Sequence, residues 1–539
     1  GLRAQQPSPL LRILEQEIGR NFGVLKEKAD PPPYFLSYTV VESEGNVIAA
    51  TMGAVTGQNH SNSRLLDVTV RVGSPALDNY HRTANDRPQF SSLVAIPVED
   101  GEAAIRRACW LETDRIYRAA SQRLIQIKTN QQVQVSRDDD SADFSKEDPA
   151  QYTGATPKLS FPAAEWTNRL RKLSARFSNY PGVLNSTVAV AAQRETKYLV
   201  NTEGSRIQTG RTTAEIVITA QGKAADGMDL GVHESFQADD PSRLPKDEVI
   251  LAAIDKAGRD LEGLLHAPVV EPYIGPAILS GRAAGVFFHE IFGHRIEGHR
   301  QKDEAEGQTF TKSVGQPVLP EFLSVIFDPT RTNLSGTFLN GAYVYDDEGV
   351  KARPVTAVDH GVLKTFLLSR SPIKGFSHSN GHGRRQIGAD VVSRQSNLIV
   401  ESSKTVSDER LKEMLREELK RQNKPWGLYF SRVTGGYTTT QRRGLQAFTV
   451  IPLVVYRVFV DGRPDELVRG VDIVGTPLAS FAKIVATSDK LEVFNGVCGA
   501  ESGSVPVSAS APAILISEIE IQKKEHSQDR PPLLSRPLG

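Results

Sequence analysis

The stretch that decides how this chain is interpreted lies at residues 285–299 and reads GVFFHEIFGHRIEGH. It holds three histidines and two glutamates in a chain with only 11 histidines. Imidazole and carboxylate groups are ligands of divalent transition metals. A glutamate that directly follows a ligating histidine is placed to deprotonate a metal-bound water. The stretch therefore predicts a metal site with His289 and His294 as ligands and Glu290 as the base.

The spacing of these two histidines is one residue longer than in the H-E-x-x-H helix, whose histidines share one helical face. At about 100° per residue, positions five apart diverge by roughly 140° around a regular helix, and positions four apart by only about 40°. His289 and His294 converge on one ion only if the helix ends near Gly293 or contains a π-type turn. We expect an irregular helix. The alternative is two ordinary helix residues satisfied by hydrogen bonds.

A third ligand is needed, because a catalytic zinc takes three protein ligands and keeps one open position. Residues 495–499 read NGVCG and place Cys498 close to two glycines. Glycine lets a loop backbone approach a metal closely. Cys498 is therefore a candidate thiolate ligand, and its alternative is a small buried hydrophobe. Glu297 and His299 are the other possible third ligands.

Four blocks of the sequence, in the same order, give the chain a resemblance to the TldD/PmbA family of metallopeptidases. They are H-E-x-x-x-H with a following E-G at residues 289–298, D-D-E-G at 346–349, G-H-G-R-R at 381–385 and C-G at 498–499. The resemblance covers mainly residues 270–520. The chain departs from the family's pattern at His299, where an acidic residue is usual, and at 500–503, where many relatives have a Lys and a Gln. These departures concern substrate details and partner choice.

The resemblance implies that Cys498 completes a Zn²⁺ site with His289 and His294. We hypothesise that Glu290 accepts a proton from the zinc-bound water. The implied activity is the hydrolysis of unfolded or extended peptides with low sequence selectivity, by a subunit that pairs with an identical or a related chain. Two alternatives stay open: a zinc amidase that acts on a small molecule, and a non-catalytic zinc-binding scaffold of a protease complex.

Apolar periodicity predicts an α+β chain whose second half is rich in strands. Helices are expected from Pro9 with Ser8 as its cap, over 102–127 with Cys109 buried, over 246–265, and after Ser407. Strands are expected over 34–41 and 47–55 with a turn at 43–46, over 65–72, 183–192 and 213–220, and over 277–279, 323–327, 342–345, 362–368, 448–460 and 514–521. With the resemblance, this predicts a two-domain subunit: an N-terminal α/β domain over 1–245, a mostly antiparallel β domain over 246–524 that carries the zinc-site helix, and a disordered tail over 525–539.

Four charged residues in the matched blocks are candidates for substrate binding: Asp347, Glu348, Arg384 and Arg385. Arginine is suited to a peptide carboxylate. An extended peptide can also add to a strand edge through main-chain hydrogen bonds, which gives affinity without side-chain selectivity. The alternative for the four residues is a structural ion-pair cluster. The acidic stretch 136–158 is expected to be a solvated surface loop, with a lid as the sharper alternative.

Composition excludes some partners. Lys plus Arg and Asp plus Glu number 64 each, so the formal net charge is zero and no bulk field collects nucleic acid. No stretch reaches the ~18 uninterrupted apolar residues of a membrane span. We therefore expect a soluble chain without nucleic-acid partners or a membrane span. The compartment stays open between the cytoplasm and export after removal of a signal, of which residues 2–5 would be the remnant.

Overall fold

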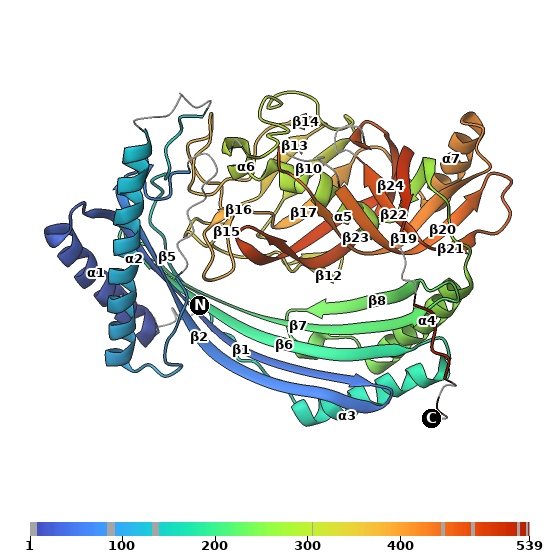
Figure 1. Cartoon of the computed structure of the whole chain (residues 1–539), viewed down its shortest axis with the longest axis horizontal. Helices are drawn as coiled ribbons and strands as arrows, with labels where there is room; N and C mark the ends of the chain where they lie inside the picture. The colour runs from blue at the N-terminus through green and yellow to red at the C-terminus, as the bar shows by residue number, and fades with distance from the viewer. Residues whose placement is uncertain are drawn as a thin grey trace, which may run out of the picture.

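The computed structural model describes residues 8–82, 92–131, 139–303, 305–442, 448–475, 480–524, 529–534 and 537. It confirms an α+β fold built on two large sheets (Figure 1). Of the predicted tail, residues 525–528, 535, 536, 538 and 539 lie outside the described residues. Within the described part of the chain, no helix is both long enough and apolar enough to cross a membrane.

The N-terminal sheet has eight strands, in the order β3-β2-β1-β6-β7-β5, with β4 paired to β2 and β8 paired to β7. Five long strands form most of it: β1 (Pro33–Thr51), β2 (Ala54–Ser74), β6 (Asn185–Asn201), β7 (Arg206–Lys223) and β8 (Asp229–Ala238). The short strands are β3 (Leu77–Asp78), β4 (Val94–Ala95) and β5 (Gln151–Thr153).

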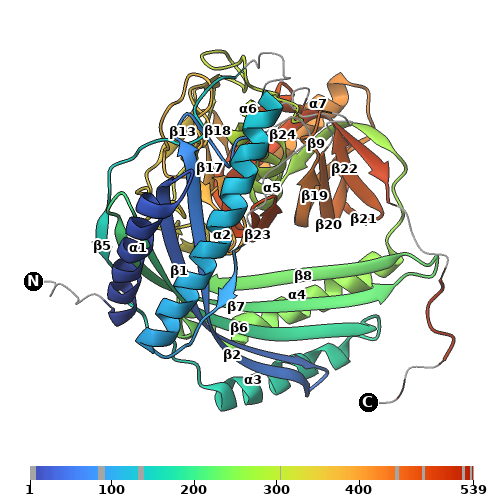
Figure 2. The same cartoon turned by 60° about the vertical axis from the view of Figure 1, so that its left-hand side comes forward.

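Four helices cover one face of this sheet: α1 (Pro9–Lys28), α2 (Glu102–Gln131), α3 (Ala163–Ala175) and α4 (Asp247–His266). Figure 2 shows α1 and α2 at one end of the sheet and α3 and α4 at the other. Alternate residues of β1 explain this arrangement: Leu36, Tyr38 and Val40 pack against α1 and α2, whereas Ile48 and Ala50 pack against α3 and α4. The opposite face of the sheet is thereby left for the C-terminal half of the chain.

The helix predictions for this half are confirmed. The side chain of Ser8 accepts a hydrogen bond from the Leu10 backbone amide at 3.2 Å and caps α1. Cys109 is fully buried on α2, as expected for a packing residue. Helix α4 packs on the N-terminal sheet through Ile250, Ile254 and Leu261. The division of the chain into domains at residue 245 stays a prediction; helix α4, which follows this position, packs on the N-terminal sheet.

The predicted turn at 43–46 is wrong, because these residues continue β1. Ser43 pairs with Ser63 on β2 and with Glu195 on β6, so the strand has a neighbour on both edges. The chain reverses instead at Met52 and Gly53, whose φ angles of 45° and 87° are both positive. Two consecutive positive φ angles are typical of the tight turns that join hairpin strands. The small polar residues at 43–46 resemble a turn sequence, but pairing with β2 and β6 keeps them in the strand.

The C-terminal sheet has twelve strands, in the order β14-β13-β10-β17-β24-β22-β20-β19-β9, with β21 on β20 and β23 between β24 and β18. Its strands are β9 (Tyr273–Leu279), β10 (Leu323–Phe327), β13 (Val355–Asp359), β14 (Val362–Leu363), β17 (Asn397–Ser402), β18 (Thr405–Val406), β19 (Trp426–Thr438), β20 (Phe448–Phe459), β21 (Glu466–Val468), β22 (Val471–Gly475), β23 (Ile484–Ala500) and β24 (Gly503–Lys523). Two small pairs lie outside it: β11 (Asn333–Leu334) with β12 (Thr337–Phe338), and β15 (Gly383–Arg384) with β16 (Val392–Ser393).

Most pairings in this sheet are antiparallel, as predicted; β9 with β19, β17 with β24 and β18 with β23 are parallel. Helix α7 (Asp408–Arg421), capped by Ser407, packs Leu411, Leu415 and Leu419 against the sheet. Two strand predictions fail: 342–345 forms no regular strand, and of 362–368 only Val362 and Leu363 pair in one. Phe366, Leu367 and Leu368 are buried although they form no regular strand, whereas Val344 is exposed.

Part of the acidic stretch is buried, which corrects the expectation of a solvated loop for residues 143–145, whereas residues 146, 148 and 149 are exposed. Asp143, Phe144 and Ser145 are buried. Arg370 donates from Nε to the Ser145 carbonyl at 3.0 Å, and Lys302 donates to the Ala142 carbonyl at 2.8 Å. Residues 136–138 of the predicted loop lie outside the described residues.

Candidate metal centre

Helix α5 (Gly281–Ile291) carries His289 and Glu290. It begins at Ser280, whose side chain accepts a hydrogen bond from the Ala283 amide at 3.2 Å. The α-helix ends at Ile291, and a short 3₁₀ helix, η3 (Gly293–Ile296), follows and carries His294. The predicted irregularity is confirmed: the helix ends between the two histidines, so their five-residue spacing no longer separates their side chains.

Gly293 is required at this break. A Cβ atom at this position would lie 1.9 Å from Oε1 of Gln395, which is far inside van der Waals contact. The amide of Gln395 also donates to the carbonyl of His289 at 3.3 Å. The glycine therefore allows the buried Gln395 side chain to hold the end of α5.

Cys498 lies on β23 and meets both histidines. Its Sγ atom is 3.2 Å from Nε2 of His289 and 3.4 Å from Nε2 of His294. The three donor atoms all lie within 4.8 Å of one another, and all three residues are buried. The expectation of an irregular loop is wrong here, since Cys498 pairs with Val505 in a regular antiparallel ladder.

Electrostatics favour the thiolate form of Cys498. Burial opposes ionisation, but the adjacent imidazoles of His294 and His289 outweigh it and lower the pKa of the thiol well below its usual value. Thiolate is the form of cysteine that binds metal.

Glu290 lies beside this triad and is also buried. Its Oε2 atom is 3.9 Å from Nε2 of His294. Burial raises the pKa of this carboxyl above its ordinary value, which makes it a stronger proton acceptor than an exposed glutamate. Gly436 of β19 packs directly on it: a Cβ there would lie 2.8 Å from Cγ of Glu290. The strand thus shields one side of the carboxylate.

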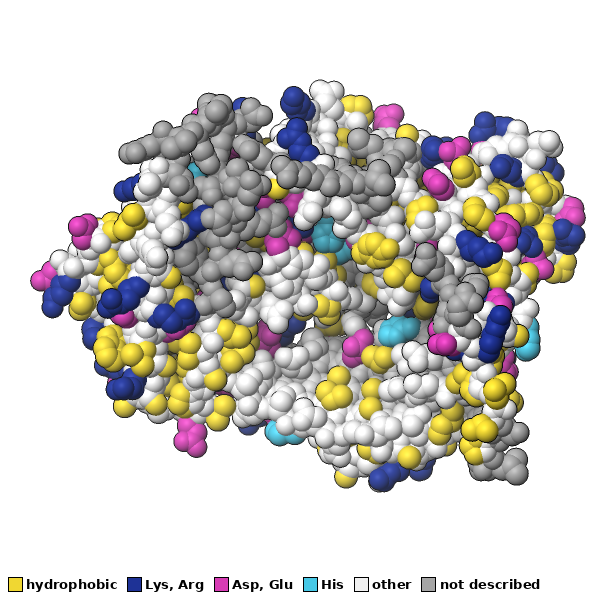
Figure 3. Space-filling view, in the orientation of Figure 1, with side chains coloured by type: hydrophobic (Ala, Val, Ile, Leu, Met, Phe, Trp, Pro, Cys, Tyr) yellow, Lys and Arg dark blue, Asp and Glu magenta, His cyan; other side chains and the backbone are white. Residues whose placement is uncertain are grey.

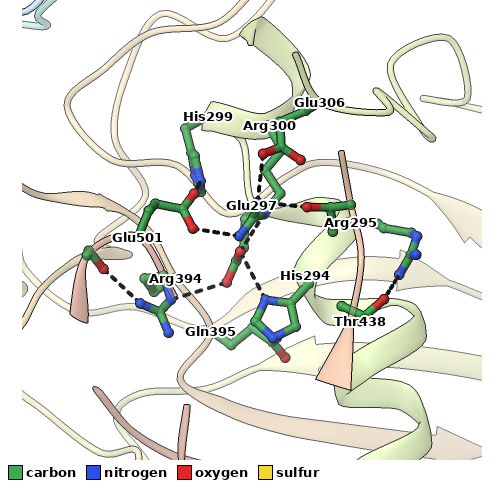
Figure 4. Close-up of polar contacts among 12 residues, drawn as sticks. His294, Arg295, Glu297, His299, Arg300, Glu306, Arg394, Gln395, Thr438 and Glu501 are labelled. Carbon is green, nitrogen blue, oxygen red and sulfur yellow. Dashed lines mark hydrogen bonds and ion pairs between the residues drawn. The ribbon is translucent and has the colours of Figure 1, made fainter. Parts of the chain in front are cut away.

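Neither alternative third ligand lies with the donor triad. Glu297 accepts a hydrogen bond from Nδ1 of His294 at 3.2 Å (Figure 4). This leaves Nε2 of His294 free to face Cys498, whose Sγ atom is 3.4 Å away. Burial opposes ionisation of Glu297, but His294 and Arg300 lower its pKa to about 2. His299 contacts Glu501 through Nε2. Two of the positions at which the sequence departs from the family's pattern therefore meet each other.

The triad opens into a cleft of about 780 Å³ between the two sheets. One wall comes from β19 and β23, including Gly436, Tyr437 and Val497, and the other from Glu215, His233, Ser235 and Gln237 of β7 and β8. Figure 3 shows the surface hollowed between the two halves of the molecule. Sequence reasoning missed the contribution of β7 and β8, because the residues that form this wall belong to no motif.

The four residues predicted for substrate binding are not among those that line this cleft. Asp347 pairs with Lys197, and Arg385 pairs with Asp67 at 2.8 Å, so both connect the N-terminal sheet to loops of the C-terminal half. Glu348 accepts a hydrogen bond from the Arg370 amide at 2.6 Å, and the Arg384 guanidinium stacks over Tyr343. Such contacts are expected under the alternative interpretation, in which the four residues form a structural ion-pair cluster. Contact of the four residues with a peptide stays a prediction.

Comparison with known proteins finds similarity to metallopeptidases. Residues 273–523 match the domain described as the PmbA/TldA metallopeptidase C-terminal domain. The chain is similar to a protein named metalloprotease from Methanothermobacter thermautotrophicus, 26% identical over 373 residues that cover 68% of this chain and 76% of the relative. It is also similar to a protein named zinc metalloprotease TldD homolog from Saccharolobus solfataricus, 26% identical over 249 residues that cover 46% of this chain and 51% of the relative. Several other curated relatives are likewise matched over about half of their length.

The fold is similar to the crystal structure of TldE from Thermococcus kodakarensis, with a TM-score of 0.62 and 14% identity, over 95% of this chain and 100% of that one. The matched domain and the curated relatives support membership of the chain in the TldD/PmbA family of metallopeptidases, and the similarity to the TldE structure shows a shared fold.

Proposed function

We propose that this protein is a zinc-dependent peptidase that hydrolyses extended peptides with low sequence selectivity. The observation that carries the proposal is the convergence of His289, His294 and Cys498 to within 4.8 Å of one another, beside the buried carboxylate of Glu290 in an open cleft. His289, His294 and Cys498 would hold the ion, and Glu290 would serve as the base.

The donor set fits zinc. Two imidazole nitrogens and one thiolate sulfur are ligands that zinc takes in proteins, and three protein ligands leave a position for solvent. The name of the relative from Saccharolobus solfataricus supports the same metal. A bound zinc ion supplies Lewis-acid chemistry: it polarises a carbonyl oxygen and activates water for attack.

The residues of the chain then have distinct tasks. Glu290 accepts the proton of the attacking water and passes it to the nitrogen of the departing amine. Glu297 holds Nδ1 of His294, which fixes the orientation of the ring and its tautomer. The wall formed by β19 shields one side of the Glu290 carboxylate from water, because Gly436 packs against it.

Low selectivity is supported by a strand edge in the cleft that has no strand partner among the described residues. From Arg432 to Tyr437, β19 pairs with β20 on one edge, and β9 reaches only the segment from Leu428 to Phe430 on the other. Across the described residues, the second edge of the later segment has no strand partner. A peptide that added there would be held through its main chain, which all peptides share.

We further propose that the subunit works as a dimer with an identical or a related chain, as the family resemblance implies. Light scattering after gel filtration of the purified chain, alone and mixed with a candidate related subunit, tests this part separately.

The central experiment compares the zinc-loaded wild type with Glu290→Gln. Substrates are an unfolded polypeptide, a folded protein and a panel of small amides. We expect cleavage of the unfolded polypeptide, equal zinc content in both proteins, and a fall in rate of about 10² to 10⁴ in the variant. Near-normal turnover by Glu290→Gln would contradict the assignment of the base. Cleavage of small amides but of no polypeptide would replace the peptidase with an amidase.

A further inference from the structure

A buried network of charges joins the segment that carries His294 to the hairpin that carries Cys498 (Figure 4). Its centre is Glu297, which is fully buried. Oε2 of Glu297 accepts from Nδ1 of His294 at 3.2 Å and from Nε of Arg300 at 2.9 Å. The Glu297 carboxylate therefore contacts both His294, a candidate metal ligand, and the guanidinium group of Arg300, which reaches the β23–β24 hairpin.

Arg300 connects this carboxylate to the β23–β24 hairpin. Its Nη2 atom donates to Oε2 of Glu501 at 2.9 Å, and its Nη1 atom donates to Oε1 of Glu306 at 3.1 Å. Glu501 lies three residues after Cys498, in the turn that joins β23 to β24. The other carboxylate oxygen of Glu501 contacts Nε2 of His299, so both of its oxygens are engaged.

Arg394 makes a second bridge between the same two segments. It is fully buried, and its Nη2 atom donates to the backbone carbonyl of Cys498 at 2.7 Å. Its Nη1 atom donates to Oγ of Ser502 at 2.8 Å, and its Nε atom lies 3.5 Å from Oε1 of Glu297. Two guanidinium groups thus tie the backbone around Cys498 to the carboxylate that orients His294.

This network constrains the distance between Sγ of Cys498 and Nε2 of His294, which have to reach the same metal ion. A zinc–sulfur bond is about 2.3 Å long, and metal sites tolerate errors of only a few tenths of an ångström. Cys498 and His294 are 204 residues apart in the chain. Without a link, their relative position would depend on the packing of a hairpin end, where strands fray most easily.

We propose that Glu501, Arg300 and Arg394 are positioning residues that hold the thiolate of Cys498 at coordination distance from His294, so that the site is assembled before the ion arrives. The inference rests on the metal site proposed above and goes beyond it, because it assigns a task to residues that do not touch the metal. Replacing a residue that orients a metal ligand typically weakens metal binding by about 10- to 100-fold.

The test compares Glu501→Gln with Glu203→Gln. Both glutamates pair with a buried arginine, Arg300 and Arg370 respectively, and their side chains are 19% and 23% exposed. Glu203 lies in the N-terminal half and does not line the cleft. The two substitutions therefore remove the same charge from similar surroundings, but only one of them belongs to the network around Cys498.

Two readouts are used on the full-length proteins. Competition with a chelator gives the dissociation constant for zinc, and the thiolate-to-cobalt absorption band of the Co²⁺-loaded proteins reports directly on the sulfur ligand. We expect Glu501→Gln to raise the zinc dissociation constant by about 10- to 100-fold and to weaken the cobalt band. Glu203→Gln should leave both unchanged.

A second variant, Ser502→Ala, removes one hydrogen bond to Arg394 and keeps every charge. It replaces Glu501→Gln in the test if that variant does not fold. It should raise the zinc dissociation constant by a smaller factor and shift the cobalt band in the same direction. A dissociation constant within about twofold of wild type in Glu501→Gln, or in Ser502→Ala when only that variant folds, would overturn the inference. Absence of zinc from the wild type would instead overturn the metal site itself, and this inference with it.

Discussion

His382, in the G-H-G-R-R block, makes the stability of this protein sensitive to acid. The imidazole is fully buried, with Nε2 at 3.1 Å from Oγ of Ser396 and Nδ1 at 3.3 Å from the carbonyl of Asn380. Burial lowers its pKa from 6.5 to about 3. The folded protein therefore keeps the ring neutral, whereas the unfolded chain protonates it below about pH 6.5.

The loss of stability at low pH follows from the difference between the pKa values of His382 in the folded and the unfolded protein. Because the unfolded state binds the proton more tightly, the free energy of unfolding falls as the pH drops from about 6.5 towards 3, and it is unaffected above that window. Each pH unit inside the window costs about 1.4 kcal/mol. Between pH 7 and pH 5, His382 should therefore remove about 2 kcal/mol of stability.

The assay is denaturant unfolding of the wild type and His382→Gln at pH 7 and pH 5, followed by tryptophan fluorescence. A chelator is present throughout, so that proton release from metal ligands does not contribute. Other buried groups titrate in the same range, so the quantity to compare is the difference between the two proteins. We expect this difference to change by about 2 kcal/mol in favour of the variant at pH 5.

Exposed His60→Gln, on β2, is the control, and its unfolding midpoint should equal that of the wild type at both pH values. The reasoning is refuted if the difference between the wild type and His382→Gln is the same at pH 7 and pH 5.

Three further predictions concern the metal centre. Chelation should abolish hydrolysis of an unfolded polypeptide, and stoichiometric zinc should restore it; activity that survives in metal-free protein would contradict a metal mechanism. Cys498→Ser should lose bound zinc by elemental analysis, whereas Cys109→Ser, at the other buried cysteine, should retain it; equal zinc content in the two variants would rule out the sulfur ligand. Gly293→Ala should cost about 1–3 kcal/mol and weaken zinc binding, because its Cβ would meet Gln395 at 1.9 Å. Gly19→Ala, at a helical glycine with nothing within 4 Å, is its control, and equal unfolding midpoints for both would contradict the overpacking argument.

Local chemistry was sufficient for several elements. The helix that begins after Ser8 and the helix that begins after Ser407 were predictable because a cap side chain and an apolar stripe act within one or two turns. The break after Ile291 was predictable from two constraints in the same short segment: histidines five residues apart and a glycine between them. In each case the residues that determine the structure are neighbours in the chain.

Tertiary structure decided the rest, because the decisive partners are distant in sequence. Ser43 to Asn46 form a strand only because β2 and β6 pair with both of its edges. The cleft gains its second wall from β7 and β8, whose Glu215 and His233 belong to no motif. Arg394 acquires its role solely from contacts with Cys498 and Glu297 across the fold. The sequence by itself determined which side chains are capable of binding a metal and how the helix between the histidines ends. Only the packing of the two sheets decided what surrounds them, since burial and charge pairing depend on which segments meet.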